Sequence, residues 1–171
     1  MKVAIVDLET TGLDAYKHEI IDIGAIIFDS KNPSDHTIID CKVKPQHIEN
    51  AEPAALKVNG YNAEEWKDAL PLDDALQLML QKASGAIFVS YNVTFDWSFI
   101  AEAYKKSPIR NPFNYHKFCL MTLAWARVPG ARSLKLRDIC LLMDIPPEPE
   151  VHKALNGAKR AFELYRKITM T

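Results

Sequence analysis

No run of apolar residues in this 171-residue sequence reaches the roughly 18 positions that a membrane-spanning helix needs. The apolar start is interrupted by the acidic Asp7, so the sequence predicts no secretory signal. There are only three cysteines, and none has C-x-x-C spacing. Cys41, Cys119 and Cys140 therefore indicate reduced, buried thiols. We expect a cytoplasmic protein that makes no membrane contact.

Acidic residues are missing from positions 103–137, although the whole chain carries 22 of them beside 21 basic residues. This segment holds eight Lys and Arg residues, and aromatic residues lie between them. These aromatic residues are Tyr104, Phe113, Tyr115, Phe118 and Trp125. Charge of one sign attracts polyanions, and aromatic faces stack on bases. Charge alone does not separate nucleic-acid contact from a solvated basic surface with the aromatic residues in the core.

The composition, 48% apolar and 25% charged, is that of an ordinary globular domain, and we expect one domain over residues 1–171. β-branched runs predict strands at 2–7, 20–28, 37–43 and 86–90, with Asn32 and Pro33 in the turn before the third. Apolar residues at helical spacing predict helices at 52–58, 72–83, 95–105, after an N-cap at Ser133, and from about 153. Residues 118–121 fit a short strand or a helix entrance. The pattern predicts a mixed α/β domain whose first three strands form an antiparallel meander.

Two carboxylates stand at the end of the first predicted strand. Asp7 and Glu9 are two positions apart, so a strand points both side chains to the same face. Like charges this close repel each other unless a cation lies between them. Oxygen ligands suit Mg²⁺ or Mn²⁺. The pair predicts a metal site, and a solvated strand end is the alternative.

Two further residues have no clear meaning alone. Asp96 follows the predicted strand 86–90, where an acidic residue at a helix start is usually a cap. His152 follows a proline-rich break, and a lone histidine is more often structural than catalytic. They become informative only because Asp7, Glu9, Asp96 and His152 occur together in this order along the chain.

Three segments, Asp7-Leu8-Glu9-Thr10-Thr11-Gly12, Asn92-Val93-Thr94-Phe95-Asp96 and His152 to Ala158, resemble the three motifs of the DEDDh 3′–5′ exonucleases. This group includes polymerase proofreading subunits, RNase T and oligoribonuclease. The resemblance runs from residue 1 to about 168. It implies an RNase H-like α/β fold, with a mixed central sheet whose first three strands are antiparallel and helices on both faces.

The resemblance also implies roles for individual residues. Asp7, Glu9 and Asp96 would be catalytic residues that hold two Mg²⁺ or Mn²⁺ ions, and His152 would be the general base. The stretch from Thr10 to Leu13 would border the terminal nucleotide. Asn92 and Phe95 would support the second motif and the nucleotide pocket. The implied partner is the 3′ end of single-stranded DNA or RNA, and the products are nucleoside 5′-monophosphates.

One position departs from the family pattern. The third motif carries its fourth acidic ligand five residues after the histidine, and here Gly157 stands at that position. A glycine offers no side-chain ligand, so the site is expected to be impaired and to retain only one ion. An introduced inactivating change, natural degeneracy, and partial replacement by Asn156 or water remain open.

Two other functions remain open besides a working exonuclease. A nucleic-acid-binding module without turnover would keep the fold, and Gly157 favours it. A subunit of a larger machine, with a protein partner or a second copy of the chain, is the other. A metal-dependent phosphatase is the most distant alternative.

Overall fold

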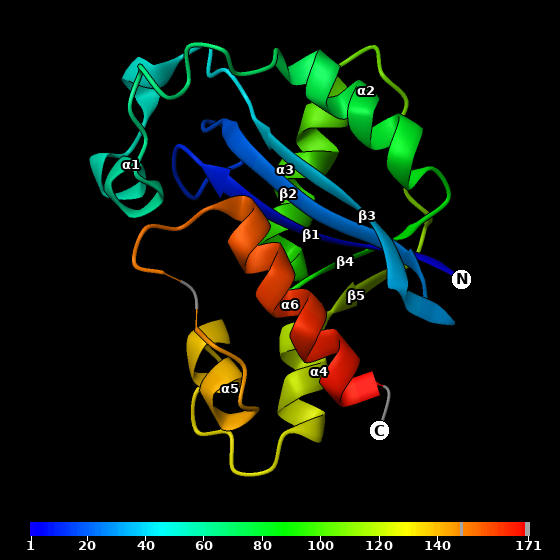
Figure 1. Cartoon of the computed structure of the whole chain (residues 1–171). Helices are drawn as coiled ribbons and strands as arrows, with labels where there is room; N and C mark the ends of the chain where they lie inside the picture. Colours follow the sequence, from blue (N-terminus) through cyan, green and yellow to red (C-terminus); the bar gives the residue numbers. More distant parts are fainter. Residues whose placement is uncertain (148, 170–171) are drawn as a thin grey trace.

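A mixed five-stranded β-sheet forms the centre of this computed structural model, which describes residues 1–147 and 149–169 (Figure 1). The strand order is β3-β2-β1-β4-β5. β1 pairs antiparallel with β2, and β2 antiparallel with β3, whereas β4 lies parallel to β1 and β5 parallel to β4. The strands are β1 (Lys2–Thr10), β2 (Ile20–Asp29), β3 (Asn32–Lys42), β4 (Ile87–Ser90) and β5 (Lys117–Cys119). The expected mixed sheet with an antiparallel start is confirmed.

Helices cover both faces of the sheet, as expected (Figure 1). They are α1 (Pro53–Asn59), α2 (Leu72–Ala83), α3 (Val93–Lys106), α4 (Leu120–Arg127), α5 (Leu136–Leu142) and α6 (Ala154–Thr169), with a 3₁₀ turn at Ile48–Asn50. One buried cluster joins α2 and α3 to one face, and a second joins α4, α5 and α6 to the other. Within the described residues, no helix is long and apolar enough to cross a membrane.

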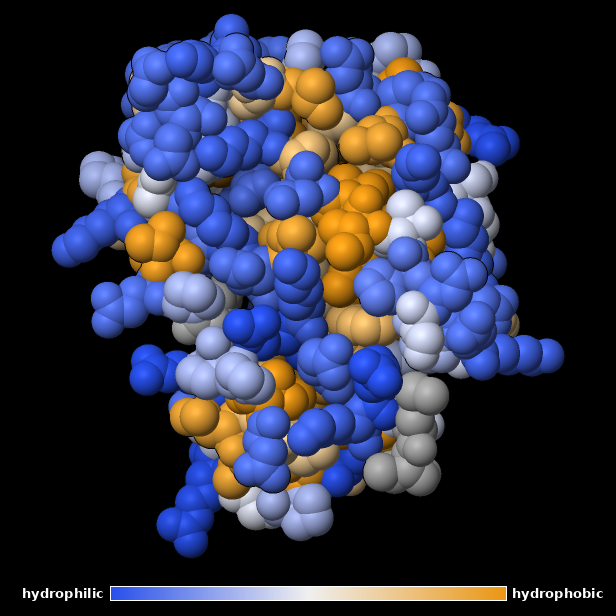
Figure 2. All heavy atoms as spheres, viewed as in Figure 1, coloured by the Kyte–Doolittle hydropathy of each residue, from blue (hydrophilic) through white to orange (hydrophobic). Residues whose placement is uncertain are grey.

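Alternation along β1 and β2 divides the two cores. Ala4 and Val6 face α2 and α3, whereas Val3 and Ile5 face the helices of the opposite side. Both central strands are therefore almost continuously apolar, as strands buried on two faces are. β3 is an edge strand and mostly exposed. Figure 2 shows apolar side chains gathered over β2 and β3 between α6 and α2. Ile38 of β3 is 46% exposed.

Two boundary predictions are wrong. Asn32 and Pro33 belong to β3 rather than to the turn, because an edge strand tolerates a residue without a backbone donor. Ser133 does not cap a helix: α5 begins at Leu136 after Lys135. The Ser133 hydroxyl instead accepts a hydrogen bond from the Lys135 amide (3.3 Å), the local turn that competes with an N-cap. The three cysteines are free thiols, as expected, and Cys119 is only half-buried.

Gly24 lets the start of α6 lie directly on β2. It lies opposite Asp7 in the β1–β2 register. A Cβ at Gly24 would overlap the backbone of Ala154 and Leu155, the first two residues of α6. A glycine inside a strand commonly marks such a close approach of another backbone. The position of α6 over the end of β1 therefore depends on this missing side chain.

We predict that Gly24→Ala destabilises the fold, because the added methyl group meets backbone atoms that cannot rotate away. The expected loss is about 1–3 kcal/mol of unfolding free energy, measured by urea denaturation. Gly85→Ala is the control, since its Cβ has no neighbour within 4 Å and only its φ of 76° disfavours a side chain. Equal stability of Gly24→Ala and the parent chain would contradict this packing.

Candidate active site

Asp7 and Glu9 both lie on the face of the sheet that α6 covers, and both are half-buried. Asp7 contacts the first turns of α6. A Cβ at Gly157 would overlap the Asp7 carboxylate, with Asp7 Cγ only 2.6 Å away. The structure therefore brings position 157 against Asp7, although the two are 150 positions apart in the sequence.

Asp96 reaches this strand end from α3, which lies on the opposite face of the sheet. Its side chain is only 3% exposed, so it is not a solvated helix cap. Burial raises the pKa of Asp96 to about 7, and the Ser90 hydroxyl and the Leu8 backbone amide partly oppose this. Leu8 lies between Asp7 and Glu9, so Asp96 belongs to the same strand end. A carboxyl group in this setting needs a proton or a cation near neutral pH.

His152 lies in the segment before α6 and is exposed. Its backbone amide donates a hydrogen bond to the Val58 carbonyl at the end of α1 (3.1 Å). The next residue of α1, Asn59, is buried and donates from its side-chain amide to the Thr10 carbonyl (3.1 Å). The end of α1 thus holds both the strand end and the histidine segment.

The residues predicted to border a nucleotide differ in exposure. Thr10 is buried and donates to the Gly12 carbonyl (2.7 Å), whereas Leu13 is 75% exposed. Asn92 is the exposed residue before α3, and its side chain makes no capping hydrogen bond. Phe95 is half-buried, and its ring centroid lies 5.1 Å from that of Phe99. Leu13 and Asn92 are the two that solvent reaches most freely.

The donor set fits a hard divalent cation by its chemistry, because Asp7, Glu9 and Asp96 offer carboxylate oxygens and one of them is buried. Their arrangement is not a finished ligand shell. Across residues 1–147 and 149–169, no three His, Cys, Asp or Glu side chains are grouped so as to hold a metal ion. Asp7 lies against Gly157 instead, in the space that a side chain at position 157 would fill.

Sequence reasoning missed Asp22, Gly24 and Asn59. Asp22 is 3% exposed in β2, and its Oδ2 accepts a hydrogen bond from the Ala154 amide at the start of α6 (3.2 Å). A signal existed for two of them: a carboxylate and a glycine interrupt the apolar run 20–28, which a buried strand does not need. For Asn59 there was no signal, because asparagine before glycine indicates only a helix end.

The segment 103–137 presents some of its aromatic residues to solvent. Tyr115, Trp125 and Phe118 are 87%, 68% and 52% exposed, whereas Tyr104 is buried and Phe113 half-buried. Two of its lysines pair with Glu102, just outside the segment, at 3.7 and 3.3 Å. The structure therefore places some of these aromatic residues in the core and others at the surface.

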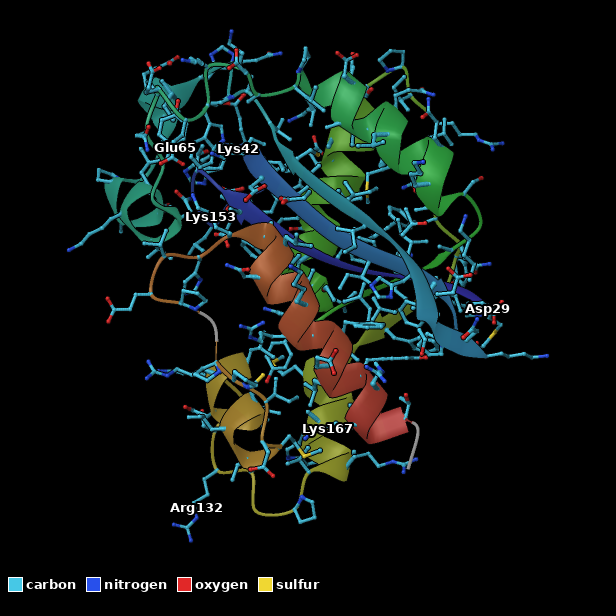
Figure 3. All side chains as sticks on the ribbon, in the orientation of Figure 1. Asp29, Lys42, Glu65, Arg132, Lys153 and Lys167 are labelled. Carbon is cyan, nitrogen blue, oxygen red and sulfur yellow. The ribbon has the colours of Figure 1, made fainter. Side chains whose placement is uncertain are left out.

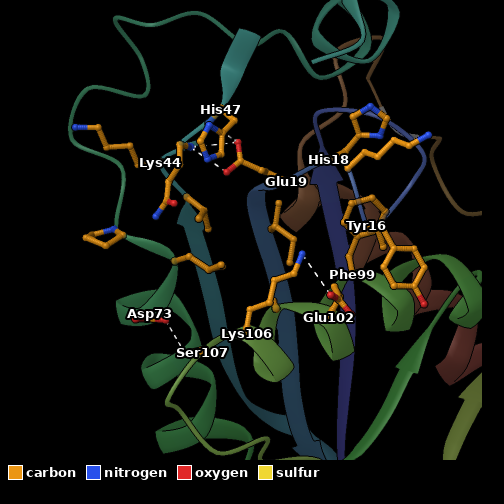
Figure 4. Close-up of a pocket in the computed structure, with 18 residues that line it drawn as sticks. Tyr16, His18, Glu19, Lys44, His47, Asp73, Phe99, Glu102, Lys106 and Ser107 are labelled. Carbon is orange, nitrogen blue, oxygen red and sulfur yellow. Dashed lines mark hydrogen bonds and ion pairs between the residues drawn. The ribbon is translucent and has the colours of Figure 1, made fainter. Parts of the chain in front are cut away.

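A cavity of about 480 Å³ lies between the start of β2, the end of β3, and helices α2 and α3 (Figure 4). It does not include Asp7, Glu9, Asp96 or His152. Some of its charged side chains already have partners: Glu19 accepts hydrogen bonds from the backbone amides at 46 and 47, and Lys106 pairs with Glu102. The cavity is therefore separate from the carboxylate site.

Comparison with known proteins places this geometry in a family. An exonuclease family model, RNase T, matches residues 4–165. Ribonuclease T of Hahella chejuensis is 29% identical over 96% of this chain and 81% of its own length. The 3′–5′ DNA exonuclease Cap18 of Escherichia coli is 30% identical, covering 95% of this chain and 89% of its own.

The fold has solved counterparts as well. A structure of apo exonuclease I aligns over 99% of this chain with a TM-score of 0.80 and 14% identity, and the chain spans 42% of that protein. The chain belongs to the RNase T family of exonucleases, a DEDDh 3′–5′ exonuclease family whose members hydrolyse phosphodiester bonds. The family resemblance and the enzyme class predicted from the sequence are confirmed.

In EDTA, we predict that the unfolding free energy falls as pH rises from about 4 to about 7. The folded chain keeps the Asp96 proton up to a pKa of about 7, whereas the unfolded chain releases it near 3.8, so deprotonation favours unfolding. Asp96→Asn is expected to lose this part of the decline and to be more stable than the parent at pH 8. Urea denaturation at pH 5 and pH 8 measures it.

The exposed Asp35→Asn is the control for removing one negative charge, and it should follow the parent at both pH values. Excess Mg²⁺ at pH 8 is expected to stabilise the parent more than Asp96→Asn. If Asp96→Asn shows the same loss between pH 5 and pH 8 as the parent, the buried carboxyl is not the group responsible.

Proposed function

We propose that this chain is a divalent-metal-dependent exonuclease domain over residues 1–171, which removes nucleoside 5′-monophosphates from single-stranded 3′ ends, and that Gly157 limits its rate. The observation that carries the proposal is the contact between Gly157 and Asp7. In the family pattern, position 157 supplies a carboxylate to the ion that Asp7 helps to hold. Here that contact is made by a residue without a side chain.

The proposal gives each residue of the candidate site a catalytic or binding role. Asp7, Glu9 and Asp96 would hold Mg²⁺ or Mn²⁺, which supplies a more acidic water and charge neutralisation at the scissile phosphate. His152 is exposed beside the site and would accept the proton of the attacking water. Thr10 to Leu13, Asn92 and Phe95 would line the terminal nucleotide. With one carboxylate missing, one of two ions is held weakly or not at all.

The substrate class rests on the relatives and on surface chemistry. One relative is named a ribonuclease and another a DNA exonuclease, so both kinds of strand are proposed substrates. The exposed Trp125 and Phe118 offer stacking surfaces, and the surrounding segment 103–137 carries only positive charge. A single strand fits this surface because its bases are unpaired and open to stacking. A cytoplasmic location is proposed from the free thiols.

A second candidate function is nucleic-acid binding without turnover. The same contact favours it, because a glycine at position 157 weakens catalysis and leaves phosphate contacts and stacking intact. Whether the chain works alone, as a dimer or within a larger assembly is a separate question that copurification addresses. Restoring the carboxylate decides between the first two functions.

We predict that Gly157→Asp raises the single-turnover rate at least about tenfold, since each 1.4 kcal/mol of transition-state stabilisation is worth that factor. The new side chain must displace the Asp7 carboxylate, which is the flexible end of its side chain and can rotate toward a bound ion. Shortening of a 5′-labelled single strand in Mn²⁺ and in Mg²⁺ measures the rate, and oligonucleotide affinity in Ca²⁺ should stay within about twofold.

Gly157→Asn and Gly157→Ala are the matched controls, because each adds a Cβ against Asp7 without adding a carboxylate. Neither is expected to gain activity. An unaltered chain that already cleaves as fast as Gly157→Asp would mean that the fourth ligand is dispensable. Binding without cleavage in every variant would favour the binding module.

We also predict that the salt dependence of single-strand binding comes from the exposed basic residues of segment 103–137. Replacing Arg127, Arg132, Lys135 and Arg137 by Gln should weaken binding and lower the slope of log affinity against log salt by about 0.7 for each phosphate that is no longer neutralised. Fluorescence anisotropy between low and moderate salt measures this slope. Lys31→Gln with Lys82→Gln, exposed residues elsewhere, are the controls for removing positive charge. An unchanged slope would mean that the segment is only solvated.

A further inference from the structure

Asp22 is a buried carboxylate in the middle of the apolar strand β2. It is 3% exposed, and its neighbours Ile21 and Ile23 are fully buried. Its Oδ1 has no hydrogen-bond partner among the described residues, whereas its Oδ2 accepts from the Ala154 amide (3.2 Å). Burial raises the pKa of Asp22 to about 6, which the Ala154 amide partly opposes. Burying such a group costs free energy, so the core alone does not explain it.

The partner of Asp22 is the first residue of α6. Amides at the start of a helix have no partner within the helix, and a carboxylate there also interacts favourably with the helix dipole. Asp22 shares its face of the sheet with Asp7, Glu9 and Gly24, and it lies opposite Glu9 in the β1–β2 register. It therefore ties the start of α6 to the same strand end that carries the candidate metal ligands.

Lys153 fastens the neighbouring position to another part of the fold (Figure 3). Its Nζ donates to the Asn59 carbonyl (3.3 Å), lies 3.8 Å from Glu65 Oε2 and sits 4.8 Å from the Trp66 ring centroid. Lys42 of β3 also contacts Glu65 and Trp66, with its Nζ 3.0 Å from Glu65 and 4.3 Å from the Trp66 ring centroid. Trp66 is itself held by a hydrogen bond from its indole N–H to the Ile21 carbonyl (2.7 Å).

Three consecutive residues are thus anchored to three different places. The His152 amide is bonded to Val58 of α1, the Lys153 side chain to the Asn59–Trp66 region, and the Ala154 amide to Asp22 of β2. Three positions later, Gly157 touches Asp7. Small movements of the first turn of α6 would move both the histidine and position 157 relative to the carboxylates of β1.

We infer that Asp22 is a positioning residue, which fixes the first turn of α6 and thereby places His152 and position 157 over the end of β1. The inference rests on the proposed function for its catalytic consequence. Asp22 itself touches no reacting atom in this scheme. Its structural part, the fixing of α6, stands on the hydrogen bond to Ala154 and is tested without any cleavage.

The test compares Asp22→Leu with Asp22→Asn. Leucine has a similar shape and no acceptor, whereas asparagine keeps an oxygen for the Ala154 amide. In the Gly157→Asp background, which is expected to be more active, Asp22→Leu should lower kcat at least about tenfold and leave oligonucleotide affinity within about twofold. Asp22→Asn should recover most of that loss. The exposed Asp40→Asn, which removes a nearby charge of the same sign, should leave kcat unchanged.

Two further measurements separate positioning from general stability. Asp22→Leu removes a buried carboxylate but leaves the buried Ala154 amide without an acceptor, so the thermal midpoint of each variant is measured first. A lower kcat at a temperature well below the midpoint, where the chain is fully folded, is not what a purely structural residue would show. Hydrogen exchange over residues 150–160 should be faster in Asp22→Leu than in Asp22→Asn. An unchanged kcat and unchanged exchange in Asp22→Leu would overturn the inference.

Failure of the proposed exonuclease function and failure of the Asp22 inference give different results. If neither the parent nor Gly157→Asp cleaves any oligonucleotide, the proposed function fails, while hydrogen exchange still reports on Asp22. If Asp22→Leu does not fold, Lys153→Met tests the neighbouring anchor by the same readouts, with the expectation of a lower kcat and faster exchange. A Lys153→Met chain equal to its parent in both would count against the anchored segment.

Discussion

The close contact of the first turns of α6 with β1 and β2 is the constraint on which the candidate site depends. Gly24 lets the helix backbone reach the sheet, and Gly157 lets the helix pass over Asp7. At both positions a Cβ would overlap neighbouring atoms, but the neighbours differ. Against Gly24 they are backbone, which is fixed, and against Gly157 they are the end of a side chain, which can rotate. Gly24 therefore sets the position of α6, while position 157 is open to chemical change.

Four carboxylates gather at the end of the sheet that the first turns of α6 cover. Asp7, Glu9 and Asp22 lie on one face, and Asp96 enters from the other. Burial raises the pKa of both Asp96 and Asp22, to about 7 and about 6, because water is excluded from both. A backbone amide partly opposes the rise in each case, that of Ala154 in α6 for Asp22 and that of Leu8 in β1 for Asp96. Asp22 is therefore tied to the helix, and Asp96 to the strand end that carries the candidate metal ligands.

Segment 103–137 shows how tertiary structure divides a uniform sequence pattern. The interleaved basic and aromatic residues do not form one surface, because α3 and the segment before β5 turn Tyr104 and Phe113 inward. Tyr104 joins the core beside α2, while Tyr115 and Trp125 are exposed. Lys117 lies 4.0 Å from the Trp97 ring centroid, and two lysines pair with Glu102. The exposed basic residues in and around α4 and α5 are Arg127, Arg132, Lys135 and Arg137.

The sequence by itself determined the fold class and the order of the elements. The apolar runs of β1 and β2, the helical spacing over 72–83 and the three motif segments are local patterns, and local patterns follow from backbone periodicity. They placed α2 at the correct boundaries and Asp7, Glu9 and Asp96 at element ends. Only the tertiary structure decided that Asp22 holds α6, that Asn59 holds Thr10, and that Gly157 meets Asp7. Each of these contacts joins residues 49 to 150 positions apart, and their partners are set by how a helix docks on a sheet rather than by any spacing along the chain.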